Sequence, residues 1–246
     1  PKGHVAKAPA HDFKTAAGAV AALMSPNLEA RWLAWQALHG LGAAAEAELK
    51  KLWADANPRQ RARALHLLAR IPGKEANYVA VALKDADPNL RITGLRIARE
   101  RGLDLVPLLK ELVDDRDPQV RREAAIAVRH SASPEAPLLW TTLAKQHDGR
   151  DRWYLEALGI AADRQWDAFL GAYLAAAPDA LKTPAGRDII WRSRSKQTPA
   201  LLAKILKDPA TAEADKPRYF RAFDFQTGPE KDAALVELLT TSVGGQ

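Results

Sequence analysis

The 246-residue sequence has no cysteine, which excludes disulfide bonds, thiolate metal ligands, a catalytic thiol and covalent CxxCH haem attachment within it. Aromatic residues are scarce, at 7% of the chain. The longest uncharged stretch, residues 15–28, contains a proline and is shorter than the about 20 apolar residues that a membrane-spanning helix needs. We therefore expect no membrane insertion.

Motifs for catalysis and cofactor binding are also missing. No two of the six histidines lie four residues apart, and no G-x-S-x-G elbow is present. Residues 40–45 fit G-x-G-x-x-A, but a predicted helix precedes them, so they are interpreted as a helix end and a turn. His147, beside Asp148, is interpreted as a solvated loop residue rather than a metal ligand. We expect no cofactor, no metal site and no enzymatic activity from these residues.

Positive charge is in excess, with 36 Lys and Arg against 30 Asp and Glu and a sequence pI of about 9.6. Hydrophobic residues make up 47% of the chain and charged residues 27%, which is typical of a folded chain rather than a disordered tail. The net charge of +6 favours acidic partners without specifying one.

A 30-residue repeat runs through the first 148 residues. Arginines recur at this spacing, and a small residue follows each of them three positions later. The arginines are Arg31, Arg61, Arg91 and Arg121, and the small residues are Ala34, Ala64, Gly94 and Ala124. Small side chains let helix axes approach to the short end of about 8–10 Å, so this column predicts close helix packing.

Each repeat contains two helical segments separated by a turn. An Asn or Asp that can cap a helix stands before a proline in its first turn in the pairs Asn57-Pro58, Asp87-Pro88 and Asp117-Pro118. Ser25-Pro26 and Thr183-Pro184 offer hydroxyl caps in the same way. Leucines at 105, 108, 109 and 112 follow the helical period, and no stretch alternates as a strand would.

A helical pair of this size cannot bury its own apolar face, so neighbouring pairs must stack. The predicted fold is all-α, an α-solenoid of about seven helical pairs plus a C-terminal capping helix. Second helices are expected to begin at residues 26, 58, 88, 118, 149, 184 and 217. We expect a flexible linker over 1–12 and one repeat domain over 13–246, with regular repeats to about 148, irregular repeats over 149–228 and the capping helix over 229–242.

The signature Asp-Pro-x-x-Arg, followed by a helix with a small residue, resembles the HEAT repeat family and is clearest in residues 87–98 and 117–128. This resemblance implies that second helices line the concave face, and that the turn Asp and the following Arg form a ladder between repeats. The predicted ladder residues are Asp87, Arg91, Asp117 and Arg121. Arg31 and Arg61 lack an equivalent Asp, so they are free to contact a ligand or solvent.

Arginines and aromatic residues gather in the irregular repeats. Arg187, Trp191 and Arg194 share one helix face by their spacing, and Asp188 and Arg192 are placed to pair beside them. The candidate partner-binding residues of the concave face are Arg152, Trp153, Tyr154, Arg187, Trp191, Arg194, Arg218, Tyr219 and Arg221. Together they suit an acidic peptide, a nucleic-acid strand or a glycan. Alternatively, the aromatic residues fill gaps between irregular repeats and the arginines cover them.

Residues 149–174, 183–206 and 216–239 resemble the HEAT-repeat region of membrane-bound dehydrogenase-type multidomain proteins of planctomycetes and verrucomicrobia. In that family a β-propeller precedes the repeats and a haem-binding CxxCH module follows them. The resemblance implies a bacterial, non-catalytic scaffold, acting as a spacer or docking platform within a larger exported, periplasmic oxidoreductase. Its partner would be a flanking domain or an acidic protein. The competing interpretation is a HEAT-like DNA-binding protein or alkylpurine DNA glycosylase with a basic aromatic concave face.

Overall fold

The computed structural model describes residues 10–243, which form α-helices and short 3-10 helices with no strand among them. The predicted linker over 1–12 therefore falls mostly outside the described residues. Within it, Asp12 accepts a hydrogen bond from the backbone N–H of Lys14 at 2.8 Å, just ahead of the first helix. None of the helices in the described part of the chain combines the length and the apolarity that crossing a bilayer requires.

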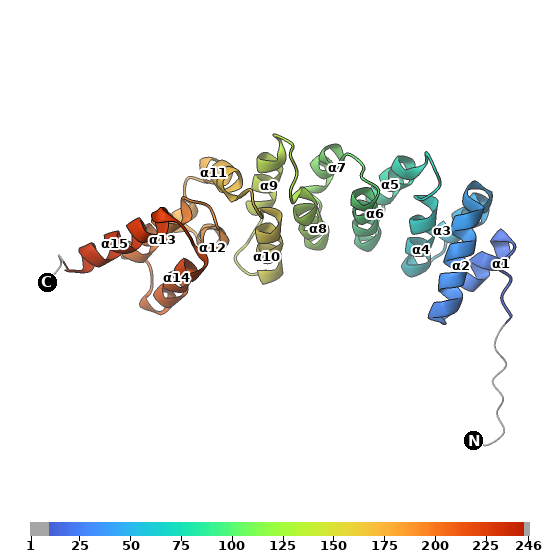
Figure 1. Cartoon of the computed structure of the whole chain (residues 1–246), viewed down its shortest axis with the longest axis horizontal. Helices are drawn as coiled ribbons and strands as arrows, with labels where there is room; N and C mark the ends of the chain where they lie inside the picture. Colours follow the sequence, from blue (N-terminus) through green and yellow to red (C-terminus); the bar gives the residue numbers. More distant parts are fainter. Residues whose placement is uncertain (1–9, 244–246) are drawn as a thin grey trace, which may run out of the picture. The chain divides into compact units, whose positions relative to one another are not determined.

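The chain divides into two compact units, residues 1–104 and 105–246. The expected single repeat domain over 13–246 stays a prediction. In unit 1 the helices are α1 (Ala16–Leu23), α2 (Leu28–Leu41), α3 (Glu46–Trp53), α4 (Pro58–Leu68), α5 (Glu75–Leu83) and α6 (Pro88–Glu100). They pack as the pairs α1–α2, α3–α4 and α5–α6, and the second helices α2, α4 and α6 contact one another in chain order (Figure 1).

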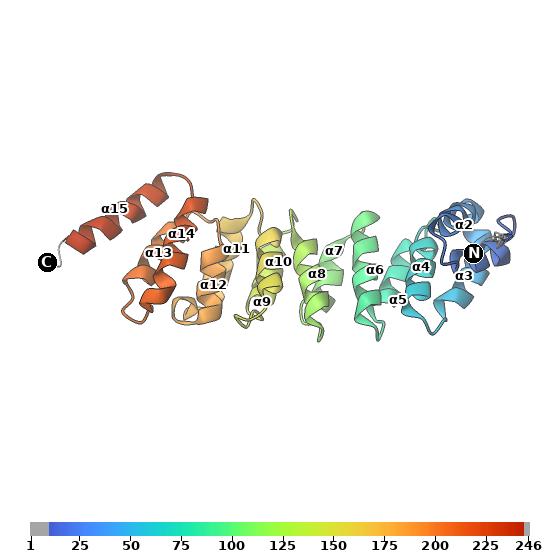
Figure 2. The ribbon, with the colours of Figure 1, turned by 90° about the horizontal axis from the view of Figure 1, so that it is seen from below.

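Unit 2 contains the remaining helices of the described residues. These are α7 (Leu105–Leu112), α8 (Pro118–Val128), α9 (Ala136–Ala144), α10 (Arg152–Ala161), α11 (Trp166–Ala176), α12 (Pro184–Arg192), α13 (Thr198–Lys207), α14 (Lys216–Ala222) and α15 (Pro229–Val243). The second helices α8, α10, α12 and α14 contact one another in that order, and Figure 2 shows them following one another. The described residues thus form the predicted all-α solenoid of seven helical pairs, with α15 after them.

The helix caps follow the predicted chemistry with one exception. Asn57, Asp87, Asp117 and Thr183 each accept a hydrogen bond from a backbone N–H in the first turn of the helix that follows. The prediction for Ser25-Pro26 was wrong. The Asn27 side chain caps α2 instead, accepting from the N–H groups of Glu29 and Ala30, because its amide oxygen lies directly before the first turn.

The small-residue column lies within the buried part of the helical pairs. Ala34, Ala64 and Ala124 are fully buried. At Gly94, an added Cβ would lie 2.9 Å from the Cβ of Ala82 on the partner helix. Helices α5 and α6 therefore approach each other as closely as the column predicted.

Candidate binding groove

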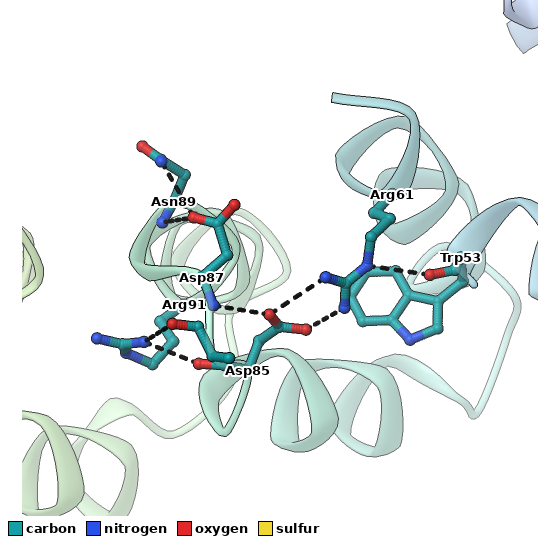
Figure 3. A network of polar contacts seen from close by, with 7 residues as sticks. Trp53, Arg61, Asp85, Asp87, Asn89 and Arg91 are labelled. Atoms are coloured by element: carbon teal, nitrogen blue, oxygen red, sulfur yellow. Dashed lines mark hydrogen bonds and ion pairs between the residues drawn. The ribbon is translucent and has the colours of Figure 1, made fainter. Parts of the chain in front are cut away.

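In unit 1, Arg61, one of the arginines at the repeat period, ties its helical pair to the next turn (Figure 3). Arg61 of α4 donates from Nε to the carbonyl oxygen of Trp53 at 3.1 Å, and its guanidinium forms an ion pair with Asp85 in the next turn. The same guanidinium lies 5.0 Å from the centre of the Trp53 ring. Arg61 was expected to be free for a ligand or solvent, but these contacts give it a structural role.

The residues of the predicted ladder make contacts within their own turns. Asp87 and Asp117 each accept a hydrogen bond at 2.8 Å from the backbone N–H two residues later, as caps do. Arg91 and Arg121 donate from Nη1 to backbone carbonyls of the preceding turn, at 2.8 and 2.6 Å. The acid that pairs with the arginine of the preceding repeat is Asp85, two positions before the cap, and sequence reasoning missed it. The available signal was a second 30-residue series of acids, Asp55, Asp85 and Asp115.

In unit 2, Arg187 makes contacts of the same kind. Its Nε donates to the carbonyl oxygen of Leu181 at 2.6 Å, Nη1 donates to the hydroxyl of Thr211 at 2.9 Å, and the guanidinium pairs with Asp208. The side chain is only 12% exposed. Arg187 was a candidate partner-binding residue, and we assign it a structural role because its donors are used within the fold.

Two tyrosines of the candidate set are buried. Tyr154 and Tyr219 are 3% and 5% exposed, and the Tyr154 hydroxyl donates to the carbonyl oxygen of Leu143 at 3.0 Å. Burial raises the pKa of both phenols above the usual value. Both rings fill space between helices, which was the alternative interpretation for the aromatic residues, and we leave them out of the binding surface.

The other candidates from α12 and α14 come together around a hollow of about 350 Å³. Its lining consists of four arginines, two aromatic rings and one acid: Arg192, Arg194, Arg218, Arg221, Trp191, Phe225 and Glu156. A second hollow of about 440 Å³ shares Trp191, Arg218 and Glu156 with the first and extends to Arg150 and Arg152 at the start of α10. Because the two hollows share these residues, we treat them as one groove, the α10–α14 groove.

The Trp191 ring lies at the centre of the groove. The Arg218 guanidinium stacks 4.5 Å from its centroid, and the indole Nε1 donates to the carbonyl oxygen of Arg218 at 3.3 Å. Arg194 stacks 4.9 Å from the ring of Phe225 and donates from Nη1 to three backbone carbonyls at the end of α12. Cation–π contacts of this kind hold guanidinium groups in place while part of each stays open to solvent.

The Asp188 carboxylate holds Arg218 in position in the groove. Its Oδ1 accepts a hydrogen bond from Arg218 Nη2 at 2.6 Å, and its Oδ2 lies 3.1 Å from Nε2 of His147, whose side chain is 1% exposed. Burial alone would raise the pKa of the Asp188 carboxyl, but the hydrogen bonds from His147 and Arg218 outweigh it and hold that pKa below its usual value. Arg218 is thereby fixed over Trp191.

Two predictions about these residues were wrong. His147 is buried against Asp188 rather than solvated, because α12 brings the carboxylate over the loop before α10. Asp188 and Arg192 do not pair as the helical spacing suggested. Asp188 pairs with Arg218 of the next repeat, whereas Arg192 donates from Nε to Glu156 of the preceding one at 3.1 Å. Contacts between repeats replace the pair expected within α12.

The groove carries more positive charge than its own acids compensate. Arg150, Arg194 and Arg221 form no ion pair with any residue that the structure describes, whereas Glu156 and Asp188 are already paired. Burial and the neighbouring Arg192 lower the pKa of Arg194, although Glu156 opposes this. Such a groove is suited to binding an anionic group. Within residues 10–240 no group of three or more acidic or histidine side chains could hold a metal ion.

The rim of the groove is exposed. The side chain of Arg152 is 82% exposed, and Trp153, the next residue on α10, is 70% exposed without lining the hollows. Phe225 is 54% exposed. The candidate set thus divides into lining residues (Arg152, Trp191, Arg194, Arg218 and Arg221), one exposed neighbour (Trp153) and three structural residues (Tyr154, Arg187 and Tyr219).

Residues 77–159 match the family model for HEAT repeats, which is about a third of the chain. This match agrees with the stacked helical pairs of the fold. No curated protein matches the chain. HEAT repeats are typically non-catalytic, and proteins built from them use their stacked helices to bind other proteins.

Proposed function

We propose that this chain is a non-catalytic protein-interaction scaffold and that its α10–α14 groove binds an acidic segment of a partner protein. The observation that supports the proposal most directly is the set of three groove arginines without an ion pair: Arg150, Arg194 and Arg221. The HEAT-repeat match supports the general class of function, since extended stacked helices bind other proteins.

The chemistry of the groove favours carboxylates. A guanidinium presents paired donors that match a carboxylate in a two-point contact, and such charge-assisted bonds are stronger than neutral ones. Between the arginines, the open side of Phe225 offers a surface for an apolar side chain of the same segment. An acidic segment with an occasional apolar residue therefore satisfies both parts of the lining.

We further propose that the scaffold is a spacer or docking platform within a larger exported oxidoreductase, with flanking domains as its partners. The resemblance of residues 149–174, 183–206 and 216–239 to dehydrogenase-type multidomain proteins supports this context. A pull-down between this chain and a separately expressed propeller or cytochrome module of such a protein tests it. Absence of binding, even when the two are tethered, would contradict the docking role.

The groove itself is tested with a fluorescein-labelled peptide in which Glu and Asp alternate with Phe. Arg221→Glu and Arg150→Glu change exposed lining residues, so the fold should persist, and each should weaken binding by about tenfold, which corresponds to about 1.4 kcal/mol. Lys145→Glu provides the matched control, because this exposed lysine at the end of α9 is not among the residues that line the groove. Fluorescence anisotropy gives the affinities, and circular dichroism checks the fold.

Duplex DNA distinguishes the competing interpretation. A DNA-binding protein would bind the duplex with an affinity whose logarithm falls with the logarithm of salt concentration, at a slope of about −0.9 per phosphate contact. Salt-dependent duplex binding that is lost in Arg221→Glu, together with no peptide binding, would replace the protein-scaffold proposal with the nucleic-acid one.

A further inference from the structure

A second surface lies in unit 1 and shares no residue with the groove. On α2, Leu28, Arg31, Trp32 and Trp35 share one face, because their spacing is i, i+3, i+4 and i+7. Leu28 is 72% exposed and Trp32 is 55% exposed. Two large apolar side chains one helical turn apart therefore remain open to solvent on the same face.

The exposed tryptophan is held in a fixed position. Its ring is parallel to that of Trp35, with an interplanar angle of 2° and a centroid distance of 5.6 Å. Trp35 packs against the core of unit 1, and the Arg70 guanidinium of α4 lies 5.5 Å from its ring. The partly buried ring of Trp35 thus holds the ring of Trp32 in place. Rigid exposed tryptophans of this kind are frequent at the centre of protein interfaces.

Three arginines lie near one another on the contacting helices α2 and α4: Arg31, which shares the apolar face, and Arg59 and Arg63 of α4. Arg63 of α4 donates to the carbonyl oxygen of Leu23 at 3.0 Å, and Arg31 donates to the carbonyls of Ser25 and Pro26, both at 2.9 Å. Burial and the charges of Arg31 and Arg59 lower the pKa of Arg63. None of the three arginines forms an ion pair within the part of the chain that the structure describes, so their mutual repulsion is uncompensated.

We propose that Leu28, Arg31, Trp32, Arg59 and Arg63, the α2–α4 surface, bind a second acidic protein segment, one that carries a large apolar side chain beside its carboxylates. The apolar side chain packs on Trp32 and Leu28. The carboxylates neutralise the arginine cluster, which relieves its repulsion. One ligand thus neutralises the positive charge of the surface and covers its exposed apolar side chains.

The aliphatic part of the surface favours protein over nucleic acid as the ligand. A nucleobase needs a ring face for stacking, and its phosphates need cations, which Trp32 and the arginines would supply. Leu28 has no role in that arrangement, although it is the most exposed large hydrophobic side chain of the described residues. A leucine or phenylalanine of a peptide would cover both Leu28 and Trp32.

The test is a selection of displayed random peptides on the full chain, followed by anisotropy measurements on labelled copies of the enriched peptides. Enriched peptides should combine Asp or Glu with a nearby Leu, Phe or Trp. Trp32→Ala and Arg59→Glu should each weaken their binding by about tenfold or more, whereas Val81→Ala and Lys84→Glu, exposed positions on the first-helix layer of unit 1, should leave it unchanged.

Variants of the two surfaces keep this inference separate from the proposed function. Peptides bound at the α2–α4 surface should keep their affinity in Arg221→Glu, which changes only the groove. The inference is overturned if no enriched peptide responds to Trp32→Ala or Arg59→Glu. It is also overturned if replacing the apolar residues of the peptide by serine leaves its affinity unchanged. Binding of a thymidine oligonucleotide that is lost in Trp32→Ala, without peptide binding, would assign the surface to single-stranded nucleic acid instead.

Discussion

The two units bury different kinds of side chain. In unit 1 the buried residues are hydrophobic apart from Arg91, within the part of the chain that the structure describes. The irregular repeats of unit 2 bury a series of polar side chains, namely Asp188, Ser193, Ser195, Thr198, Thr211 and Gln226. In unit 1, apolar columns therefore make up nearly all of the buried layer between neighbouring pairs. In the irregular repeats, buried polar side chains and their hydrogen bonds take over part of this role.

The ladder arginines show what is preserved across this difference. Arg61 reaches an acid 24 residues later in the chain, and Arg187 reaches one 21 residues later. Both also donate from Nε to a backbone carbonyl of the helical segment that precedes their own helix. The contact between neighbouring repeats therefore survives a change in repeat length, because it depends on the positions of the turns and not on sequence spacing.

The largest expected loss of stability comes from adding a methyl group at a glycine where two segments pack closely, and it should differ between the two units. At Gly186 in unit 2, an added Cβ would lie 2.2 Å from the carbonyl oxygen of Ala180, so backbone has to move. At Gly94 in unit 1 it would meet the methyl group of Ala82 at 2.9 Å. Gly186→Ala should lower the free energy of unfolding by about 3 kcal/mol and Gly94→Ala by about 1 kcal/mol. Urea unfolding measures both, and equal losses would contradict the distinction.

The next effect concerns the buried carboxylate of the irregular repeats. Asp188→Asn removes the charge that pairs with Arg218 and contacts His147, and should cost about 2 kcal/mol at neutral pH, reduced from the value for a fully buried pair because Arg218 is 44% exposed. Because the folded pKa of Asp188 lies below its unfolded value of about 3.9, its stabilisation is present above that pH and is lost as the pH falls through the folded pKa.

Thermal unfolding between pH 7 and pH 2 checks this dependence on Asp188. The difference in melting temperature between the wild-type chain and Asp188→Asn should decrease steadily below about pH 4. A difference that stays constant across this range would show that the carboxylate charge does not stabilise the fold.

A smaller effect is expected at Gln226, whose Nε2 donates to the carbonyl oxygen of Ser193 at 3.0 Å. Gln226→Met keeps the approximate volume and removes the hydrogen bond, leaving a buried carbonyl with one partner fewer. The free energy of unfolding should fall by about 1 kcal/mol. Leu38→Met, at a fully packed apolar position of unit 1, is the control for side-chain shape, and should cost less if the polar contact is what matters.

The smallest expected effect is a change in the pKa of Glu46 in unit 1. Hydrogen bonds from Lys74, Tyr78 and Lys50 lower the pKa of Glu46 to about 2. Its contribution to stability is therefore present above the unfolded pKa of about 4.3 and is lost as the pH falls towards 2. Tyr78→Phe removes one donor and should raise the Glu46 pKa, which carboxyl-carbon NMR follows directly. An unchanged pKa would rule out the tyrosine contact.

The sequence predicted the fold well because its signals are local and periodic. The Asn and Asp caps, the small column and the helix over 105–112 all depend on spacing along one helix or turn, and the structure confirms them. Alanine and glycine at 30-residue intervals indicate close helix packing because a larger side chain would hold the two axes apart. Prolines after the caps placed most second helices within three residues of their observed starts.

The site was harder to predict because its contacts join residues of different repeats. Helical spacing placed Asp188 beside Arg192, but the partner of Asp188 lies 30 residues later in the chain. Tyr154 and Tyr219 were indistinguishable in sequence from exposed aromatic residues such as Trp153, because burial depends on the neighbouring pair. Periodicity describes one helix face and does not specify which face its neighbour covers.

The position of Asp85 has a consequence for synthesis of the chain. Arg61 leaves the ribosome before the acid that will hold it, and so does Arg187 relative to Asp208. These two helical pairs are therefore completed by residues that are translated after them. If translation pauses just before such an acid, the guanidinium of the preceding helical pair lacks its carboxylate. The incomplete helical pair is then accessible to chaperones, so the rate of elongation across these turns affects folding of the chain.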